Sequence, residues 1–115
     1  MSEDFILEMF DFIDSRQWAG LREKFCDDVV YERPGYDPIE GLDDLLTFYS
    51  EVRIIASGKH HLSHVVVNEG AGASWGRFIG EGKDSSPLDE RFADVYTFEN
   101  GKIKHRTSYF FRAAI

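Results

Sequence analysis

The stretch FADVYTFENGKIKHRTSYF, residues 92–110, decides the fold. Its first half is rich in aromatic and β-branched residues, and Phe92, Tyr96 and Phe98 fall on one face of an extended chain. The dipeptide Asn100–Gly101 then favours a tight hairpin turn, and a second strand-like run follows it. The stretch therefore predicts two antiparallel strands, Leu88–Glu99 and Lys102–Arg112.

Upstream of this hairpin, helical patterns come first and strand patterns follow. Apolar residues recur at helical spacing from Phe5 to Ile13, from Trp18 to Phe25, and from Leu42 to about Ala56. Further strands are expected at residues 28–33, 60–68 and 73–80, and residues 34–41, with two prolines and two glycines, read as a loop. This order predicts a single α+β domain over residues 1–115.

The expected layers have a consequence for function. Three amphipathic helices must cover one face of a strongly curved, mostly antiparallel sheet of about five strands, which leaves a pocket between the layers. The other face of the sheet also needs cover, and a homodimer would supply it. Trp75 and Arg77 share a strand face, where they would either stack on a planar ligand or belong to that dimer surface, and the second alternative is favoured.

Length and composition narrow the classes of protein. The chain has 115 residues, 43% hydrophobic and 30% charged, which is enough for one packed domain. A net charge of −8 argues against a nucleic acid or an anionic membrane as partner. The single cysteine, Cys26, excludes an internal disulfide framework, and no run of about 18 apolar residues predicts a membrane span. We therefore expect a cytoplasmic protein.

Two segments carry a family resemblance: FCDDVVYERPGYDPIEGLDDLLTFY, residues 25–49, and FADVYTFENGKI, residues 92–103. Both resemble the NTF2-like superfamily, and the chain is most similar to SnoaL-like polyketide cyclases and ketosteroid isomerases over essentially its whole length. The resemblance implies a cone-shaped α+β fold, with three N-terminal helices packed on a strongly curved, mostly antiparallel sheet that encloses a pocket. It also implies a reaction without a cofactor.

The resemblance implies roles for particular positions. Ketosteroid isomerases have a general-base Asp just before the proline that ends the first strand, and that position is Arg33 here. Their oxyanion-hole Tyr corresponds to Phe10. Their protonated Asp, and the acid/base Asp of SnoaL-like cyclases, both correspond to Asp94. The Asp–Arg–Asp set of limonene-epoxide hydrolases would end at Ser108, so the resemblance favours a cyclase-type site over epoxide hydrolysis.

Asp94 is the leading candidate for chemistry. Strand alternation puts it on one face with Phe92 and Tyr96, where desolvation would raise the pKa of its carboxyl and suit it to donate or shuttle a proton. Arg33 is a permanent cation. It would bind a carboxylate or an enolate oxygen, pair with Asp94, or lie solvated at the strand end, and these alternatives remain open.

The register of the last hairpin decides which residues face Asp94. A two-residue turn pairs Phe98 with Ile103 and brings His105, an alternative acid/base, to the face of Asp94. A three-residue loop with a bulge at Gly101 instead brings Arg106, Ser108 and Phe110 there. The family pattern favours the second register, so Arg106 is the second candidate cation.

The remaining pocket residues are mostly aromatic. Tyr31 shares the face of Arg33, and Tyr49 lies on the apolar face of the third helix. The predicted ligand pocket is lined by Phe10, Tyr31, Tyr49, Phe92, Tyr96, Ser108 and Phe110. His60 and His64 share a strand face but lie about 13 Å apart at the rise of a strand, and His61 faces away, so we expect no metal site.

These residues support two functional hypotheses. The first is a cofactor-independent cyclase or isomerase, in which Asp94 moves a proton on a small, apolar, enolisable carbonyl ligand of polyketide or steroid type and Arg33 or Arg106 stabilises the oxyanion. The alternative is a non-catalytic ligand-binding or accessory module. A third reading is a structural dimer whose own aromatic side chains fill the cavity.

Overall fold

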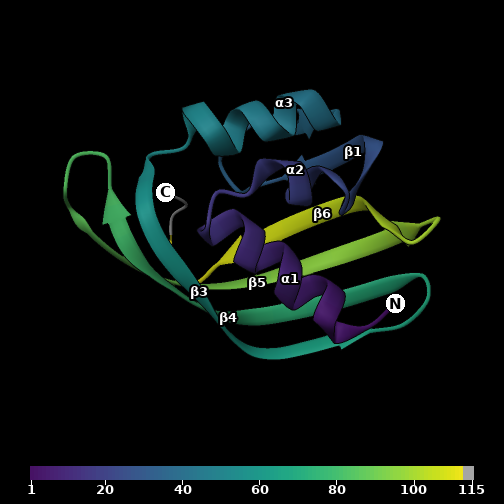
Figure 1. Ribbon diagram of the computed structural model, residues 1–115. Coiled ribbons are helices and arrows are strands. Elements are labelled where there is room, and N and C mark those ends of the chain that lie inside the picture. Colours follow the sequence, from purple (N-terminus) through teal and green to yellow (C-terminus); the bar gives the residue numbers. More distant parts are fainter. Residues whose placement is uncertain (113–115) are drawn as a thin grey trace.

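The computed structural model describes residues 1–112. Its helices lie on one side of a curved sheet (Figure 1). The α+β architecture expected from the sequence is confirmed, with helices and strands in the expected order. The elements are α1 (Glu3–Asp14), α2 (Trp18–Arg22), β1 (Phe25–Glu32), β2 (Ile39–Glu40), α3 (Leu42–Thr47), the π-helix η1 (Phe48–Val52), β3 (Ile55–Val67), β4 (Ala71–Gly82), β5 (Pro87–Glu99) and β6 (Lys102–Phe110).

The described strands form one sheet of six, in the order β2-β1-β6-β5-β4-β3. Strand β1 pairs with β6 in parallel, and the other neighbours are antiparallel. The sheet therefore has one strand more than expected, because the stretch read as a loop contains β2. That two-residue strand pairs Ile39 with Tyr31 and Glu40 with Val30.

The core fills the space between the helices and the concave face of the sheet. Helix α1 packs against β3, and its apolar stripe is fully buried at the i, i+3, i+4 and i+7 positions expected of an amphipathic helix, namely Ile6, Met9, Phe10 and Ile13. Within residues 1–112, no helix is long and apolar enough to cross a membrane.

The turn between β5 and β6 has two residues. Asn100 and Gly101 have φ angles of 53° and 74°, as both central positions of a type I′ turn require. Phe98 accordingly pairs with Ile103, as the first of the two alternative registers predicts.

A bulge then changes the register of this hairpin. Thr97 pairs with His105, so Lys104 has no partner of its own and the ladder shifts by one residue. Because side chains alternate along a strand, the shift returns the faces to those of the second alternative. The β6 residues that share the face of Asp94 are Arg106, Ser108 and Phe110.

The third helix is shorter than expected and ends irregularly. It changes to the π-helix η1 at Phe48 and ends at Val52, whereas the sequence predicted a helix as far as about Ala56. The backbone N–H of Arg53 closes the wide last turn by donating to the carbonyl of Phe48 at 3.0 Å. Arg53 itself has an extended backbone, φ −62° and ψ 149°, which starts the chain into β3.

Candidate active site

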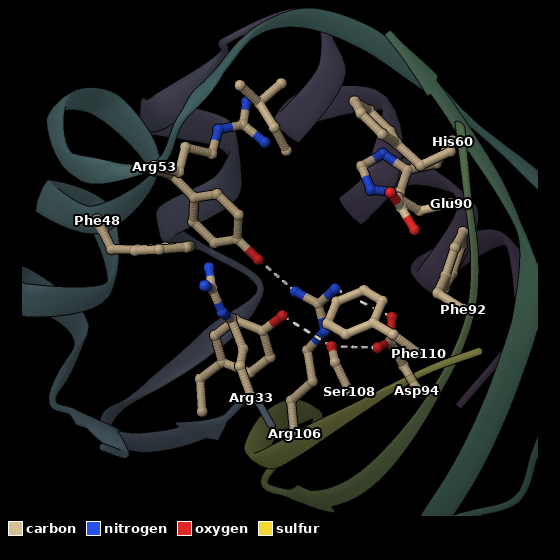
Figure 2. A pocket seen from close by; sticks show the side chains of 14 residues that line it. Arg33, Phe48, Arg53, His60, Glu90, Phe92, Asp94, Arg106, Ser108 and Phe110 are labelled. Carbon is tan, nitrogen blue, oxygen red and sulfur yellow. Dashed lines mark hydrogen bonds and ion pairs between the residues drawn. The ribbon is translucent and has the colours of Figure 1, made fainter. Parts of the chain in front are cut away.

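A cavity lies between the helices and the concave face of the sheet. Its inner chamber, about 60 Å³, is lined by aromatic side chains and by six arginine, histidine or acidic ones, namely Arg33, Arg53, His60, Glu90, Asp94 and Arg106. An outer hollow of about 270 Å³ adjoins it, since Arg33, Arg53, Tyr31 and Phe48 line both. His60 and Glu90 lie on the wall opposite Arg33 and Phe48 (Figure 2).

Asp94 lies at the closed end of the inner chamber and forms a buried ion pair. Its side chain is 1% exposed, and its Oδ2 accepts a hydrogen bond from Nη2 of Arg106 at 3.0 Å. Its Oδ1 accepts from the hydroxyl of Ser108. The Ser108 oxygen is in turn 2.7 Å from the hydroxyl of Tyr31, which must be the donor because the Ser108 proton is already committed.

Arg106 extends this network to the helix layer. Its Nη1 donates to the hydroxyl oxygen of Tyr49, and its guanidinium lies 4.6 Å from the centre of the Tyr31 ring. Burial alone would lower the pKa of Arg106, but the neighbouring Asp94 carboxylate, together with Tyr49, Tyr31 and Tyr96, more than offsets this and holds the pKa well above its ordinary value. The same burial raises the pKa of the Tyr31 hydroxyl. Arg106 is therefore a fixed cation and Tyr31 a neutral donor.

The surroundings of Asp94 combine both sequence expectations. Strand alternation gave it the aromatic neighbours Phe92 and Tyr96, and one of the two hairpin registers added Arg106 and Ser108. In the structure the Arg106 guanidinium and the Ser108 hydroxyl each donate a hydrogen bond to one of its oxygens. Arg106 takes the pairing that was considered for Arg33.

Arg33 belongs to the cavity and not to a solvated strand end. Its guanidinium carbon lies 4.4 Å from the centre of the Tyr36 ring and 4.5 Å from that of Phe48. Both distances lie within the range of about 6 Å over which a ring attracts a guanidinium. The side chain lines both the inner chamber and the outer hollow.

A scan against protein-family models matches residues 6–106 to the SnoaL-like domain. The chain belongs to the SnoaL-like domain family. A search of curated proteins finds no match to this chain.

Solved structures share the fold of this SnoaL-like protein at low sequence identity. An NTF2-like protein of unknown function from Burkholderia pseudomallei superposes with a TM-score of 0.85 and 18% identity, over 96% of this chain and 92% of the other. A putative SnoaL-like polyketide cyclase from Jannaschia sp. gives 0.81 and 12%, over 94% and 83%. An LEH-like epoxide hydrolase from M. tuberculosis gives 0.81 and 14%, over 93% and 80%. At these identities the likeness establishes the NTF2-like fold.

The cavity of this SnoaL-like protein contains most of the residues predicted to line it. Tyr31, Tyr49, Phe92, Ser108 and Phe110 all do so. The other two predicted lining residues, Phe10 and Tyr96, do not line it.

Phe10 and Tyr96 form a second layer behind the cavity. The Phe10 ring is 4.7 Å from that of His60 and 5.7 Å from that of Phe92, so it supports two lining residues from the helix side. The Tyr96 hydroxyl is 2.7 Å from the buried hydroxyl of Ser74, away from the chamber. Both were predicted from position alone, and intervening side chains cover them.

His105 lies on the opposite face of the sheet from Asp94. Its Nε2 is 2.8 Å from Oε2 of Glu32, and both side chains are close to half exposed. The hydrogen bond from His105 lowers the pKa of Glu32. The expectation that His105 faces Asp94 as an alternative acid/base is therefore wrong, because the bulge at Lys104 turns the His105 side chain to the outer face of the sheet.

His60 is a candidate site residue that the sequence analysis did not place in the pocket. Its Nδ1 is 2.6 Å from Oδ1 of Asp14, and its backbone N–H donates to Oδ2 of the same carboxylate at 2.8 Å. The carboxylate of Asp14 therefore fixes the imidazole from the helix side while His60 lines the cavity. A bulge near Ser63 separates it from His64, which stacks on Trp75 on the outer face, so the two histidines do not share a face as expected.

Glu90 and Arg53 also went unnoticed in the sequence. Glu90 is 4% exposed, lines the cavity and is paired with Arg112, whose nitrogens lie 2.6 and 2.8 Å from its two oxygens. Its position two residues before Phe92 and four before Asp94 carried the signal, since alternation puts it on their face. Arg53 had no such signal, because the helical pattern ran through it.

Proposed function

We propose that this SnoaL-like protein is a cofactor-independent cyclase or isomerase that moves a proton on an enolisable carbonyl compound. The observation that carries the proposal is the buried pair of Asp94 and Arg106, which hydrogen-bonds Tyr49 in a cavity whose other lining residues combine aromatic rings with a few charged side chains. Such a cavity suits a flat molecule that carries a carbonyl group. The SnoaL-like family and a structural neighbour described as a putative polyketide cyclase agree with this reaction class.

Tyr49 is suited to stabilise an oxyanion. Its hydroxyl oxygen accepts a hydrogen bond from Arg106, so its own proton is available to a substrate oxygen. The Arg106 charge behind it strengthens that donation as negative charge develops. In this arrangement Asp94 is a positioning residue, since its two oxygens hold Arg106 and Ser108 in place.

His60 is better suited than Asp94 to carry the proton. Both oxygens of Asp94 already accept hydrogen bonds, whereas no hydrogen bond among residues 1–112 engages Nε2 of His60. Imidazole changes its charge between pH 5 and 8, which suits general acid–base catalysis near neutral pH. The Asp14 carboxylate engages Nδ1 and so fixes the ring, which leaves Nε2 as the nitrogen that can take a proton.

The proposed reaction follows from these positions. Nε2 of His60 removes a proton from the carbon next to the carbonyl, the C–H electron pair forms the C=C bond of an enolate, and the carbonyl oxygen takes the charge opposite Tyr49. Where a C=C bond is conjugated with the enolate, return of the proton from His60 to the far carbon of that system restores the carbonyl and completes an isomerisation. Attack of the enolate carbon on a second carbonyl of the same molecule forms the new C–C bond, and the alkoxide that results takes the proton back from His60, which completes a cyclisation.

A non-catalytic binding module is the second candidate function. It is favoured by one observation: each carboxylate that lines the cavity already has a basic partner, Arg106 for Asp94 and Arg112 for Glu90. Such a site binds a ligand without a carboxylate base. It requires His60 to serve only as a hydrogen-bond donor.

We also propose that the protein forms a homodimer through the outer face of the sheet. That face exposes large apolar side chains, among them Val66 (59% exposed), Trp75 (40%), Val95 (42%) and Tyr109 (57%). Burying such side chains against a second copy is favourable in proportion to the apolar area removed from water. The charge of −8 and the single cysteine keep the cytoplasm as the proposed location.

The test combines binding with proton exchange. A thermal-shift screen of β-dicarbonyls, hydroxyanthraquinones and steroid enones identifies ligands, since a compound at about 100 times its Kd stabilises the fold by roughly 2.7 kcal/mol. For each hit, NMR in D₂O measures deuterium incorporation next to the carbonyl. We expect the wild type to exceed buffer alone and His60→Gln to lower the enzymatic rate about 100-fold or more.

Two controls make this experiment decisive. His61→Gln changes the neighbouring, exposed histidine and should leave exchange unchanged, and circular dichroism checks that each variant folds. If Asp94→Asn folds and abolishes exchange while His60→Gln does not, Asp94 carries the proton. If ligands bind and exchange never exceeds buffer, the binding-module hypothesis replaces catalysis.

A further inference from the structure

Arg53 is a buried cation set into the cavity by the π-helix. It directly follows η1, and the wide turn closed by its N–H to the Phe48 carbonyl lets the chain leave the helix at this residue. Its side chain lines both the inner chamber and the outer hollow, although the residue is only 8% exposed. Figure 2 shows its guanidinium at the edge of the central space, on the side away from Arg106.

The guanidinium of Arg53 has no acidic partner among residues 1–112. No ion pair or side-chain hydrogen bond of the described chain engages it, and its Nε is fully buried without an acceptor. Its closest described contact is the Tyr49 ring, whose centre is 5.3 Å from the guanidinium carbon. Burial lowers the pKa of Arg53. A buried charge in this state is costly unless a ligand or partner compensates it.

No carboxylate among residues 1–112 forms an ion pair with Arg53. Asp14 stabilises its charge through space without a hydrogen bond to it, and is itself held by both the backbone and the ring of His60. Glu90 accepts two hydrogen bonds from Arg112, and Asp94 accepts from Arg106. Arg53 is therefore left without a hydrogen-bonded acidic partner in the described chain, at the wall of the space a ligand would occupy.

We propose that Arg53 binds a carboxylate of the ligand, so that the substrates are small carboxylic acids that also carry an enolisable carbonyl group. A guanidinium binds a carboxylate through two parallel N–H donors, a geometry that a neutral carbonyl cannot match. The inner chamber of about 60 Å³ admits only a few non-hydrogen atoms, so the acid is compact or extends into the outer hollow. This substrate class rests on the proposed proton-transfer function.

The two ends of the cavity then divide the recognition of such a substrate. Arg53 fixes the carboxylate at one end, and Tyr49, backed by Arg106, receives the carbonyl oxygen at the other. A molecule held at both ends has its intervening carbon within the cavity that His60 lines. Two-point binding of this kind orients the C–H bond for proton transfer and is the main gain from an anchored carboxylate.

The experiment compares acids with their neutral esters. Isothermal titration calorimetry measures the binding of acetoacetate and benzoylacetate, each against its methyl ester, to the wild type, Arg53→Gln, Arg53→Lys and Arg91→Gln. Arg91 is an exposed arginine on the outer face of the sheet, so Arg91→Gln removes the same charge far from the cavity.

We expect each acid to bind the wild type at least tenfold more tightly than its ester. Arg53→Gln should weaken acid binding roughly 10- to 100-fold, the usual effect of losing hydrogen bonds to a charged group, and leave ester binding unchanged. Arg53→Lys should retain part of the preference because it keeps the charge but loses the paired donors. Arg91→Gln should match the wild type.

Equal affinity of acid and ester for the wild type overturns the proposal, and this comparison does not depend on whether any variant folds. Failure of both acids to bind at millimolar concentration overturns it as well. Deuterium exchange separates the two ideas. If acids bind through Arg53 but their protons exchange no faster than in buffer, the proton-transfer function fails and the carboxylate site stands.

Discussion

The buried pair of Asp94 and Arg106 leads to a prediction about stability that does not depend on any substrate. The perturbation is a cycle of three variants: Asp94→Asn, Arg106→Met and the double variant. Both side chains are almost fully buried, at 1% and 5% exposed, so solvent screens their interaction little. Each single substitution leaves one charged or polar group in the core without the partner that compensates it.

The expected magnitudes follow from the geometry. Unit charges 3.0 Å apart interact by about 5.5 kcal/mol at an effective dielectric constant of about 20. Leaving one member of such a pair unpartnered costs about 3–5 kcal/mol. Asp94→Asn retains an oxygen that can accept from Ser108, so we expect about 3 kcal/mol, and about 4 for Arg106→Met, which also loses the bond to Tyr49.

The double variant is the decisive member of the cycle. It removes both charges, so its loss of stability should be at least about 3 kcal/mol smaller than the sum of the single losses. Urea unfolding, followed by fluorescence of Trp18 and Trp75, measures the free energy of unfolding of each variant. The exposed pair Arg77–Asp89, with side chains 57% and 51% exposed, is the control, and its coupling should stay below about 1 kcal/mol. Single losses under 1 kcal/mol that add in the double variant would refute a buried ion pair.

Two further predictions concern alkaline pH and the outer face of the sheet. Burial raises the pKa of Tyr31 in the folded protein, so below about pH 10 its hydroxyl is neutral in both the folded and the unfolded chain. Above that pH the hydroxyl ionises in the unfolded chain first, so the free energy of unfolding falls as the pH rises. Unfolding measured from pH 8 to 11.5 should therefore fall less steeply for Tyr31→Phe than for the wild type, and parallel curves would contradict the burial of this hydroxyl. If the exposed Trp75 lies in a dimer interface, Trp75→Lys should convert a dimer to a monomer in sedimentation velocity. The control Glu23→Lys, a change on the exposed surface of the helix layer, should leave the dimer intact. A wild type that sediments as a monomer at 100 μM would rule the dimer out.

The parts of the site that lie on regular elements could be predicted from the sequence. Asp94 and Phe92 follow strand alternation, so their common face was visible without a structure. Tyr49 follows the helical spacing of the third predicted helix in the same way, although it lies in η1 in the structure. What alternation could not reveal is the partner of Asp94, because the distance of 3.0 Å to Arg106 depends on how two strands are paired and not on either strand alone.

Two arginines owe their place in the cavity to irregularities: Arg106, which one of the two hairpin registers predicted, and Arg53, which the sequence did not identify. The bulge at Lys104 turns His105 outward and Arg106 inward, although the turn itself follows the register that predicts the reverse. The π-helix ends the third helix early and turns Arg53 into the cavity. One inserted residue in a strand, or one wide turn in a helix, changes every side-chain direction beyond it, and neither leaves a mark in hydrophobic periodicity.

These irregularities are informative about function because of the side chains that they direct into the cavity. A regular β6 would bring His105 and Thr107, both more polar than Phe110, to face Asp94. A regular third helix would continue through Arg53 and carry its side chain past the cavity. Instead, each irregularity brings an arginine into a largely aromatic cavity, one paired with a carboxylate and one without. A fold that only needed to fill its own interior would gain more from apolar side chains at both positions, since a buried guanidinium is costly to desolvate. This desolvation cost is consistent with a ligand whose oxygen atoms accept hydrogen bonds from the buried guanidinium of Arg53.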